Sequence, residues 1–300
     1  MAIETLVKTV FSDDFRKEMW SKLSAGKLMS PSFKKNVKIG DEVDVQFHGF
    51  PSLKDYTGGD IDVSTFEETT LTTVKVKINK GKAIAFKVPT LVIRQIENAK
   101  TNEEKVKIIR EYTADAHEQF KRAVNKACCE EYVRAGHVID NEGAAITLDN
   151  ENIIRIFAKA KIELKNGDGK GHTAWADGQM LAIISTNMEA HMSTQGLLQY
   201  SDVMAKNYKT GYKGDFMGFH VIVDDEICRD ADGNVYPLFG RQGKTIAGGV
   251  QDDMELKSDT PVGGFDPHYW GRAVFGVKAP LSYLLCTAKL KDDFDVVPSA

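Results

Sequence analysis

Apolar residues recur at helical spacing over residues 101–136. The stripe that they form has as its core Val106, Ile109, Ala116, Phe120, Val124 and Ala127, at steps of three, four and seven. Thr101 and Glu104 match the Thr-x-x-Glu capping box, and Gly136 suits a helix end because glycine tolerates positive φ. The pattern predicts one unbroken helix, about 54 Å long at about 1.5 Å per residue, with its stripe packed on another element.

Two segments before this helix alternate between apolar and polar residues, which is the pattern of β-strands. The first spans residues 39–47 and the second residues 74–78, and residues 49–70 between them are rich in Thr, Asp and Gly. A two-stranded ribbon is marginal on its own, so we expect either a hairpin folded on its own domain or an arm that contacts another subunit. The predicted contact residues are Val43, Val45, Phe47, Tyr56, Gly58, Gly59, Val74, Val76 and Ile78.

The rest of the chain predicts a mixed α+β protein. Residues 21–36 have few apolar anchors and indicate an extended arm, which is stable only against its own domain or a neighbouring chain. After Gly136 we expect a helix over 151–164, a buried strand over 180–184, a helix within 186–198 and several short strands. Residues 273–277 and 283–290 are expected to form the last two strands.

Composition and charge exclude some classes of protein. The 300 residues carry a net charge of −4 spread along the chain, which predicts no nucleic-acid or membrane affinity by itself. No apolar run approaches the roughly 20 residues of a membrane span. The four cysteines contain no Cys-x-x-Cys pair, and we expect them to be reduced.

No motif predicts a catalytic, cofactor-binding or metal site. Residues 240–245 resemble a phosphate-binding loop, but Leu238 stands where that motif requires glycine. The turn at 230–234 has three oxygen ligands in step, but Val235 replaces the glycine of a calcium loop. The seven histidines lack metal-ligand spacing, and His117 is expected at the surface or the edge of the core. We therefore expect no cofactor and no enzyme activity.

The order of these elements resembles the major capsid protein of tailed bacteriophages, a fold shared with encapsulins and the herpesvirus capsid floor. Residues 37–45 resemble the entry to that family's extended loop, 55–60 its tip and 83–88 its returning strand. The helix over 101–136 resembles its spine helix, and residues 275–280 resemble a late segment of many such proteins. The resemblance spans nearly the whole chain.

The resemblance implies a division of the chain into five parts. These are an N-terminal arm (1–36), an extended β-ribbon loop (37–88), a peripheral domain with the spine helix (89–142), a central axial domain (143–241) and a return to the peripheral domain with a C-terminal tail (242–300). The ribbon and the arm are expected to lie on neighbouring subunits.

The resemblance also implies partners. Copies of the chain would form pentamers and hexamers of an icosahedral or prolate shell, assembled in the host cytoplasm and enclosing DNA without sequence-specific binding. A separate scaffolding protein and a portal are expected, decoration proteins are a further option, and no membrane is involved.

Two other classes of protein remain as alternatives. One is an encapsulin-like nanocompartment that encloses a cargo enzyme. The other is a soluble enzyme with a site around His220, Asp224 and Asp225.

Overall fold

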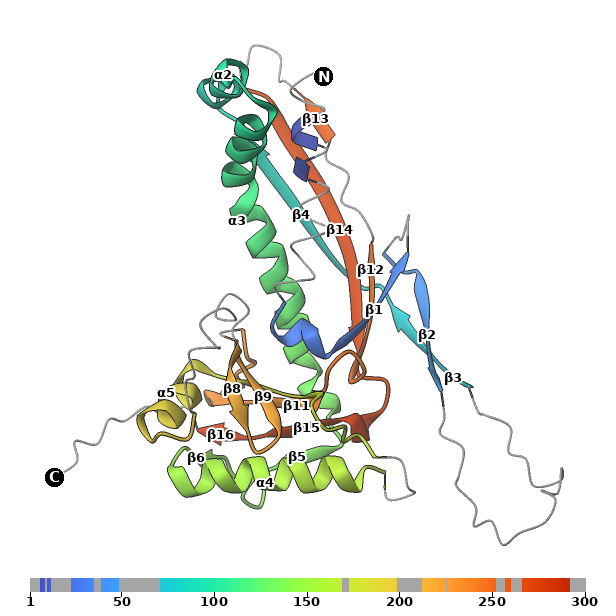
Figure 1. Ribbon diagram of the computed structural model, residues 1–300. Helices are drawn as coiled ribbons and strands as arrows, with labels where there is room; N and C mark the ends of the chain where they lie inside the picture. The colour runs from blue at the N-terminus through green and yellow to red at the C-terminus, as the bar shows by residue number, and fades with distance from the viewer. Residues whose placement is uncertain are drawn as a thin grey trace, which may run out of the picture.

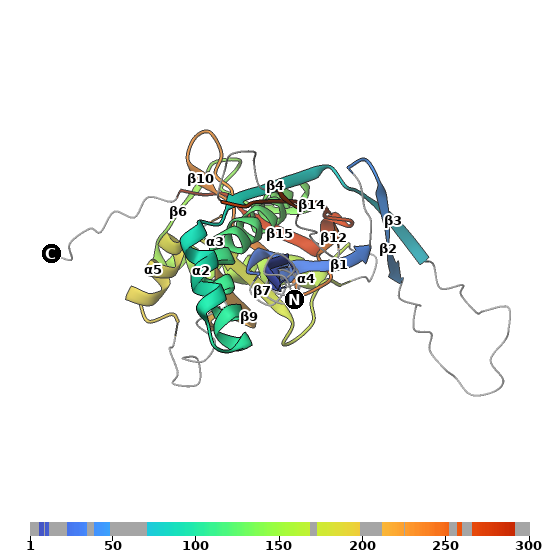
Figure 2. The ribbon, with the colours of Figure 1, turned by 90° about the horizontal axis from the view of Figure 1, so that it is seen from above.

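A computed structural model of the chain describes residues 6–8, 10–11, 23–34, 39–48, 71–168, 173–198, 212–224, 226–251, 257–259 and 266–291. Its elements form an upper and a lower lobe, and helix α3 (Asn102–Cys129) runs along the upper lobe into the lower one (Figure 1). A two-stranded ribbon, β2 (Glu42–His48) with β3 (Leu71–Lys77), projects to one side in both views (Figures 1 and 2). The fold is α+β, as the sequence predicts.

Helix α3 is shorter than predicted. Its 28 residues correspond to about 42 Å at about 1.5 Å per residue. The predicted capping box is present, because Thr101 accepts from the Glu104 backbone N–H and the Glu104 carboxylate accepts from the Thr101 N–H. After Cys129 the chain tightens into the 3₁₀ turn η3 (Glu130–Arg134). One unbroken helix to residue 136 is therefore a wrong prediction, since the chain must turn to reach the strand that follows.

Gly136 serves close packing and not a left-handed helix end. Its φ is not positive. Instead its N–H donates to the carbonyl oxygens of Ser282 and Leu285, at 2.8 and 3.2 Å. A Cβ at this position would lie 2.7 Å from the Ser282 carbonyl carbon. The absence of a side chain thus allows the chain after η3 to approach the 282–285 segment.

A sheet of five strands forms the upper lobe. Its central strand, β14 (His268–Lys278), pairs antiparallel with β4 (Lys80–Lys87), β12 (Ile246–Gln251) and β13 (Lys257–Asp259). Strand β1 (Met29–Lys34) adds to β12 in parallel. Helix α2 (Thr90–Asn98) lies at the top of the lobe (Figure 1).

The apolar stripe of α3 faces this sheet. Ile109, Phe120, Val124 and Ala127 are buried, and Val106 and Ala116 are half-buried. The rings of Phe120 and Phe275 of β14 meet edge to face with centroids 5.6 Å apart. Ile109 instead packs into a second, smaller cluster with Val88, Ile96 and Tyr269.

The main core fills the lower lobe and continues into the upper lobe at Phe120 and Phe275. The six-stranded sheet of the lower lobe has the order β5-β15-β11-β7-β9-β8, and a three-stranded sheet has the order β10-β16-β6. The strands are β5 (His137–Ile139), β6 (Ile146–Thr147), β7 (Met180–Ile184), β8 (Tyr212–Phe216), β9 (Phe219–Val223), β10 (Asn234–Val235), β11 (Leu238–Arg241), β15 (Leu285–Ala288) and β16 (Leu290–Lys291). The 3₁₀ turn η6 (Ser282–Leu284) precedes β15.

Helices α4 (Asn150–Asn166) and α5 (Thr186–Thr194) complete this lobe, and both match predicted helices. Phe157 of α4 contacts the rings of Phe216, Phe219 and Phe239 edge to face, at centroid distances of 4.9, 5.7 and 5.2 Å. These aromatic contacts join α4 to the sheet. The last strands, β15 and β16, belong to this lobe, whereas the sequence-based division assigned 242–300 to the peripheral domain and the tail.

The described part of the N-terminal arm lies on its own chain. The 3₁₀ turn η1 (Ala25–Leu28) buries Ala25 and Leu28, and Leu23 and Met29 on either side are buried as well. Strand β1 then pairs with β12 of the same chain. The expectation that a neighbouring subunit orders this arm is wrong for residues 23–34, because the arm's few apolar anchors are enough to bind it to its own core.

The base of the ribbon is also anchored within the chain. Val43 and Ile78 pack with Val274, and Val76 packs with Ala247. All five side chains are buried. Val43, Val76 and Ile78, which were predicted to contact another subunit, are instead buried within their own chain. Val74 is half-buried, the side chains of Val45 and Phe47 lie outside the described structure, and so do Tyr56, Gly58 and Gly59.

Two glycines make room for this base. Gly249 of β12 and Gly276 of β14 are direct partners in the sheet. A Cβ on Gly276 would lie 2.2 Å from the Lys77 carbonyl oxygen, and one on Gly249 would lie 2.8 Å from Ile78. The ribbon can therefore cross the sheet only where both strands lack side chains.

Candidate assembly surfaces

One face of the upper-lobe sheet carries an exposed aromatic residue. His268, Trp270 and Arg272 alternate outward along β14, whereas Tyr269 faces the cluster around Ile109. Trp270 is 40% exposed beside a shallow hollow of about 550 Å³. The hollow is lined by Ala85, Phe86, Lys87, Asp259, His268, Tyr269 and Trp270. An exposed tryptophan among small and polar residues fits the composition of interface centres.

Other exposed apolar side chains are scattered over the described surface. They are Ile39, Leu91, Val133, Val138, Ile154 and Ile162. They are spread over several elements, although Ile154 and Ile162 are both on α4, and scattered apolar residues are ordinary on a protein surface. None of them defines a site alone.

A buried carboxylate fastens the arm, helix α3 and the lower lobe together. Asp224, which follows β9 and is 6% exposed, accepts hydrogen bonds from the Ser24 hydroxyl and the Ala25 N–H. Asn125 of α3 donates to the Ser24 Oγ at 2.8 Å and accepts from the Gly26 N–H at 3.2 Å. Segments 100 to 200 residues apart in sequence therefore meet at one polar cluster, named here the Asp224 clamp.

His117 makes a related attachment higher on the helix. It is 9% exposed, its Nε2 lies 3.3 Å from the Phe11 carbonyl oxygen, and its ring stacks on the Phe11 ring at 4.4 Å. This buried position is consistent with the edge of the core and with a structural role.

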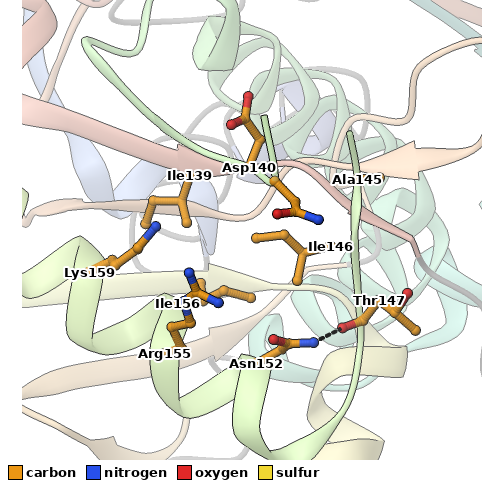
Figure 3. A pocket seen from close by; sticks show the side chains of 10 residues that line it. Ile139, Asp140, Ala145, Ile146, Thr147, Asn152, Arg155, Ile156 and Lys159 are labelled. Atoms are coloured by element: carbon orange, nitrogen blue, oxygen red, sulfur yellow. Dashed lines mark hydrogen bonds between the residues drawn. The ribbon is translucent and has the colours of Figure 1, made fainter. Parts of the chain in front are cut away.

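The lower lobe has a polar cavity of about 190 Å³ between α4 and the segment that joins β5 to β6 (Figure 3). Its apolar lining includes Ile139 and Ile156, which are both buried. Its polar lining is Asp140, Asn141, Thr147, Asn152, Arg155 and Lys159. Asn152 is held in place, since its side-chain amide donates to the Thr147 carbonyl oxygen at 3.1 Å and to Asp149 at 2.7 Å.

The three residues of the enzyme alternative do not form one site in the described part of the chain. His220 lies against Asp215 through Nδ1, and its Nε2 is 3.0 Å from the Gly178 carbonyl oxygen. Asp224 belongs to the clamp, and Asp225 lies outside the described residues. The structure therefore does not bring His220 and Asp224 into one described site.

In the turn at 230–234, neighbouring groups donate hydrogen bonds to the Asp230 carboxylate. Asp230 accepts from the N–H groups of Asp232 and Asn234, from the Asn234 side chain and from the Tyr236 hydroxyl. The side-chain hydrogen bond from Asn234 is the main cause that lowers the pKa of Asp230 to about 2. Within the described residues no group of three or more His, Cys, Asp or Glu side chains is arranged to hold a metal ion.

The cysteines are free thiols in mostly apolar surroundings. Cys128, Cys129 and Cys286 are buried and Cys228 is half-buried. Burial raises the pKa of the Cys228 thiol to about 11 and also raises the pKa of the three buried thiols. Thiolate is the reactive form of cysteine, so these residues are suited to packing.

Sequence reasoning missed Trp270 and the Asp224 clamp. Trp270 was missed because residues 268–272 lack a clean alternation of apolar and polar residues, although adjacent Tyr269 and Trp270 are a strand signal. The clamp joins three distant segments, and no local pattern reports such a contact. In the described part of the chain no helix is long and apolar enough to cross a membrane.

Comparison with known proteins identifies the fold. No family model matches the sequence, and no curated protein matches it. Among solved structures, the chain is similar to the capsid of Ralstonia phage GP4, with a TM-score of 0.62 and 12% identity over 93% of both chains.

Two further structures extend the comparison beyond phages. The SrpI encapsulin of Synechococcus elongatus matches with a TM-score of 0.55 and 9% identity, over 95% of this chain and 92% of that chain. A virus-like particle from Pyrococcus furiosus matches with a TM-score of 0.52 and 15% identity, over 95% and 98%. The chain therefore has the fold shared by tailed-phage capsid proteins and encapsulins, with a spine helix and an extended ribbon loop.

Proposed function

We propose that this protein is the major capsid protein of a tailed bacteriophage, a structural subunit that assembles into a closed shell around DNA. The observation that carries the proposal is the match to the phage GP4 capsid over 93% of both chains. The Asp224 clamp adds support, because it anchors distant segments to one another.

In this proposal the ribbon β2–β3 reaches a neighbouring subunit. The base of the ribbon is fixed in the sheet of its own chain, and β2 and β3 project away from the body (Figure 2). The hollow at Trp270 is the surface that we assign to a neighbour's ribbon, since it combines exposed apolar area with polar edges. Weak contacts of this kind suffice when they repeat across many copies.

The finer parts of the proposal concern partners. Subunits are grouped in pentamers and hexamers of an icosahedral or prolate shell, and a separate scaffolding protein and a portal take part in assembly in the host cytoplasm. Decoration proteins would bind the outer surface. The net charge of −4 argues against strong nonspecific DNA binding, so enclosure of DNA rests on the shell and not on an affinity of the subunit.

Negative-stain electron microscopy of the expressed chain, with and without a candidate scaffolding protein, tests this function. Closed shells of uniform diameter are expected in at least one of the two samples. Only monomers or dimers in both samples would contradict a shell function and would favour the enzyme alternative.

An encapsulin-like compartment is the second candidate, because the SrpI encapsulin also matches along nearly the whole chain. Particles purified from their native host distinguish the two. Nuclease-protected DNA of defined length supports the capsid, whereas a stoichiometric cargo protein without DNA supports the compartment.

A further inference from the structure

The polar cavity of the lower lobe is lined by two cations that pair with no described side chain. Arg155 and Lys159 lie one turn apart on α4, are exposed, and both line the cavity (Figure 3). Among the described residues neither forms an ion pair or a hydrogen bond. Asp140 also lines the cavity, so the three charged groups leave it with one net positive charge. Anionic groups are therefore the favoured occupants.

The described chain ends beside this cavity. Strand β16 ends at Lys291, which is paired in parallel with Thr147 of β6, and Thr147 itself lines the cavity. The sequence continues as Asp292, Asp293, Phe294 and Asp295, which lie outside the described residues. These four residues offer three carboxylates and one aromatic ring.

We propose that the acidic segment 292–295 of the same chain binds at this cavity, with its carboxylates on Arg155 and Lys159. Reach is sufficient, because an extended residue spans about 3.3 Å and the segment starts next to a residue of the cavity wall. The interaction ties the segment after β16 to α4.

Cleavage of the full-length protein by chymotrypsin after Phe294, followed by intact mass, tests the proposal. Cleavage requires release of the segment, so its rate reports the released population. The double variant Arg155→Glu/Lys159→Glu is expected to be cleaved there about three- to tenfold faster, as two partly exposed ion pairs predict. Arg155→Gln/Lys159→Gln, which keeps similar side-chain stems, should show a smaller increase and covers the case in which charge reversal disturbs folding.

A matched control changes the net charge equally elsewhere. Arg94→Glu/Lys100→Glu alters two exposed cations at the far end of the upper lobe and should leave the rate at the wild-type value. The cleavage rate of a charge-swapped tail, Asp292→Arg/Asp293→Arg/Asp295→Arg, is then measured with the wild-type cavity and with the Arg155→Glu/Lys159→Glu cavity. Both proteins have the same sequence around the protease site, so a difference in rate reports the cavity alone. Protection of this tail by the reversed cavity supports the proposal.

Equal cleavage rates for the cavity variants and the control would overturn it. A rate change that occurs only in assembled particles, and not in dispersed subunits, would overturn the assignment to the same chain and place a neighbour's segment in the cavity. Neither readout depends on whether the shell encloses DNA or a cargo, so the inference stands apart from the proposed function.

Discussion

At the scale of single residues, buried polar groups connect segments that are distant in the sequence. Asp224 is buried yet accepts from Ser24 and Ala25, and its Oδ1 also accepts from the Glu226 N–H at 2.9 Å. A buried carboxylate is stable only when its hydrogen-bonding capacity is met. The clamp therefore depends on all of its partners being present at once.

Replacing Asp224 by Ala tests the clamp. The buried Ala25 N–H would lose its acceptor, which costs about 1–3 kcal/mol for a buried group left unsatisfied, and the half-buried Ser24 hydroxyl would lose its acceptor as well. We expect a lower melting temperature and faster proteolysis within residues 23–34. Glu151→Ala, which removes an exposed carboxylate on α4, is the control; equal melting temperatures for the two variants would show that the clamp carries no stability.

Asp230 provides a pH-dependent prediction. Its folded-state pKa of about 2 lies below the ordinary value of 3.8. A depressed pKa stabilises the folded state above the unfolded-state pKa, and this contribution is lost as the pH falls from 3.8 towards about 2.

The variant Asp230→Asn removes the charge and keeps the shape. We expect its melting temperature to be below wild type near neutral pH and the difference to shrink as the pH is lowered through this window. A difference that stays constant down to about pH 2 would mean that the charge of Asp230 is not the stabilising feature.

At the scale of elements, much of the fold could be predicted because its signals are local. The capping box fixed the start of α3, and the 3.6-residue period identified α4 through residues such as Ile153 and Phe157. The end of α3 could not be predicted, since η3 forms where Gly136 docks on the 282–285 segment. The anchoring of the ribbon base also depends on distant residues, among them Gly249 and Gly276.

The spine helix offers the simplest test of an element. Phe120→Asp would place a charge between α3 and Phe275 in the core, at a cost of several kcal/mol. We expect loss of soluble assembled protein, measured by size-exclusion chromatography. Gln119→Asp, on the exposed side of the same helix, should assemble normally. Normal assembly of Phe120→Asp would mean that the stripe is not a core.

The glycine pair tests the position of the ribbon. A side chain at Gly276 would collide with the backbone of Lys77, so Gly276→Val must displace β3 from the sheet. We expect lower thermal stability and increased hydrogen exchange of the β2–β3 amides. The control Val277→Ala also loses stability, because its side chain belongs to the core, but it does not collide with β3 and should leave the exchange of the β2–β3 amides unchanged. Unchanged exchange in Gly276→Val would contradict this packing.

At the scale of the whole molecule, one main core joins the lower lobe to the upper-lobe sheet, a smaller cluster lies around Ile109, and the ribbon extends away from both lobes (Figure 1). Such a shape gives one subunit a body and an arm, which suits a repeating shell. The sequence supported this reading through the order of elements. The exposed surface at Trp270, which we propose as a partner surface, could not be predicted, because β14 gains its outward face only after it pairs with β4 and β13.

Cryo-electron microscopy of particles assembled from the purified chain tests the central claim most directly. The proposal predicts a closed shell with fivefold vertices, in which the ribbon of each subunit lies over a neighbour's upper-lobe sheet near Trp270. A chain that remains monomeric or dimeric under assembly conditions, or a shell in which the ribbon contacts only its own subunit, would contradict it.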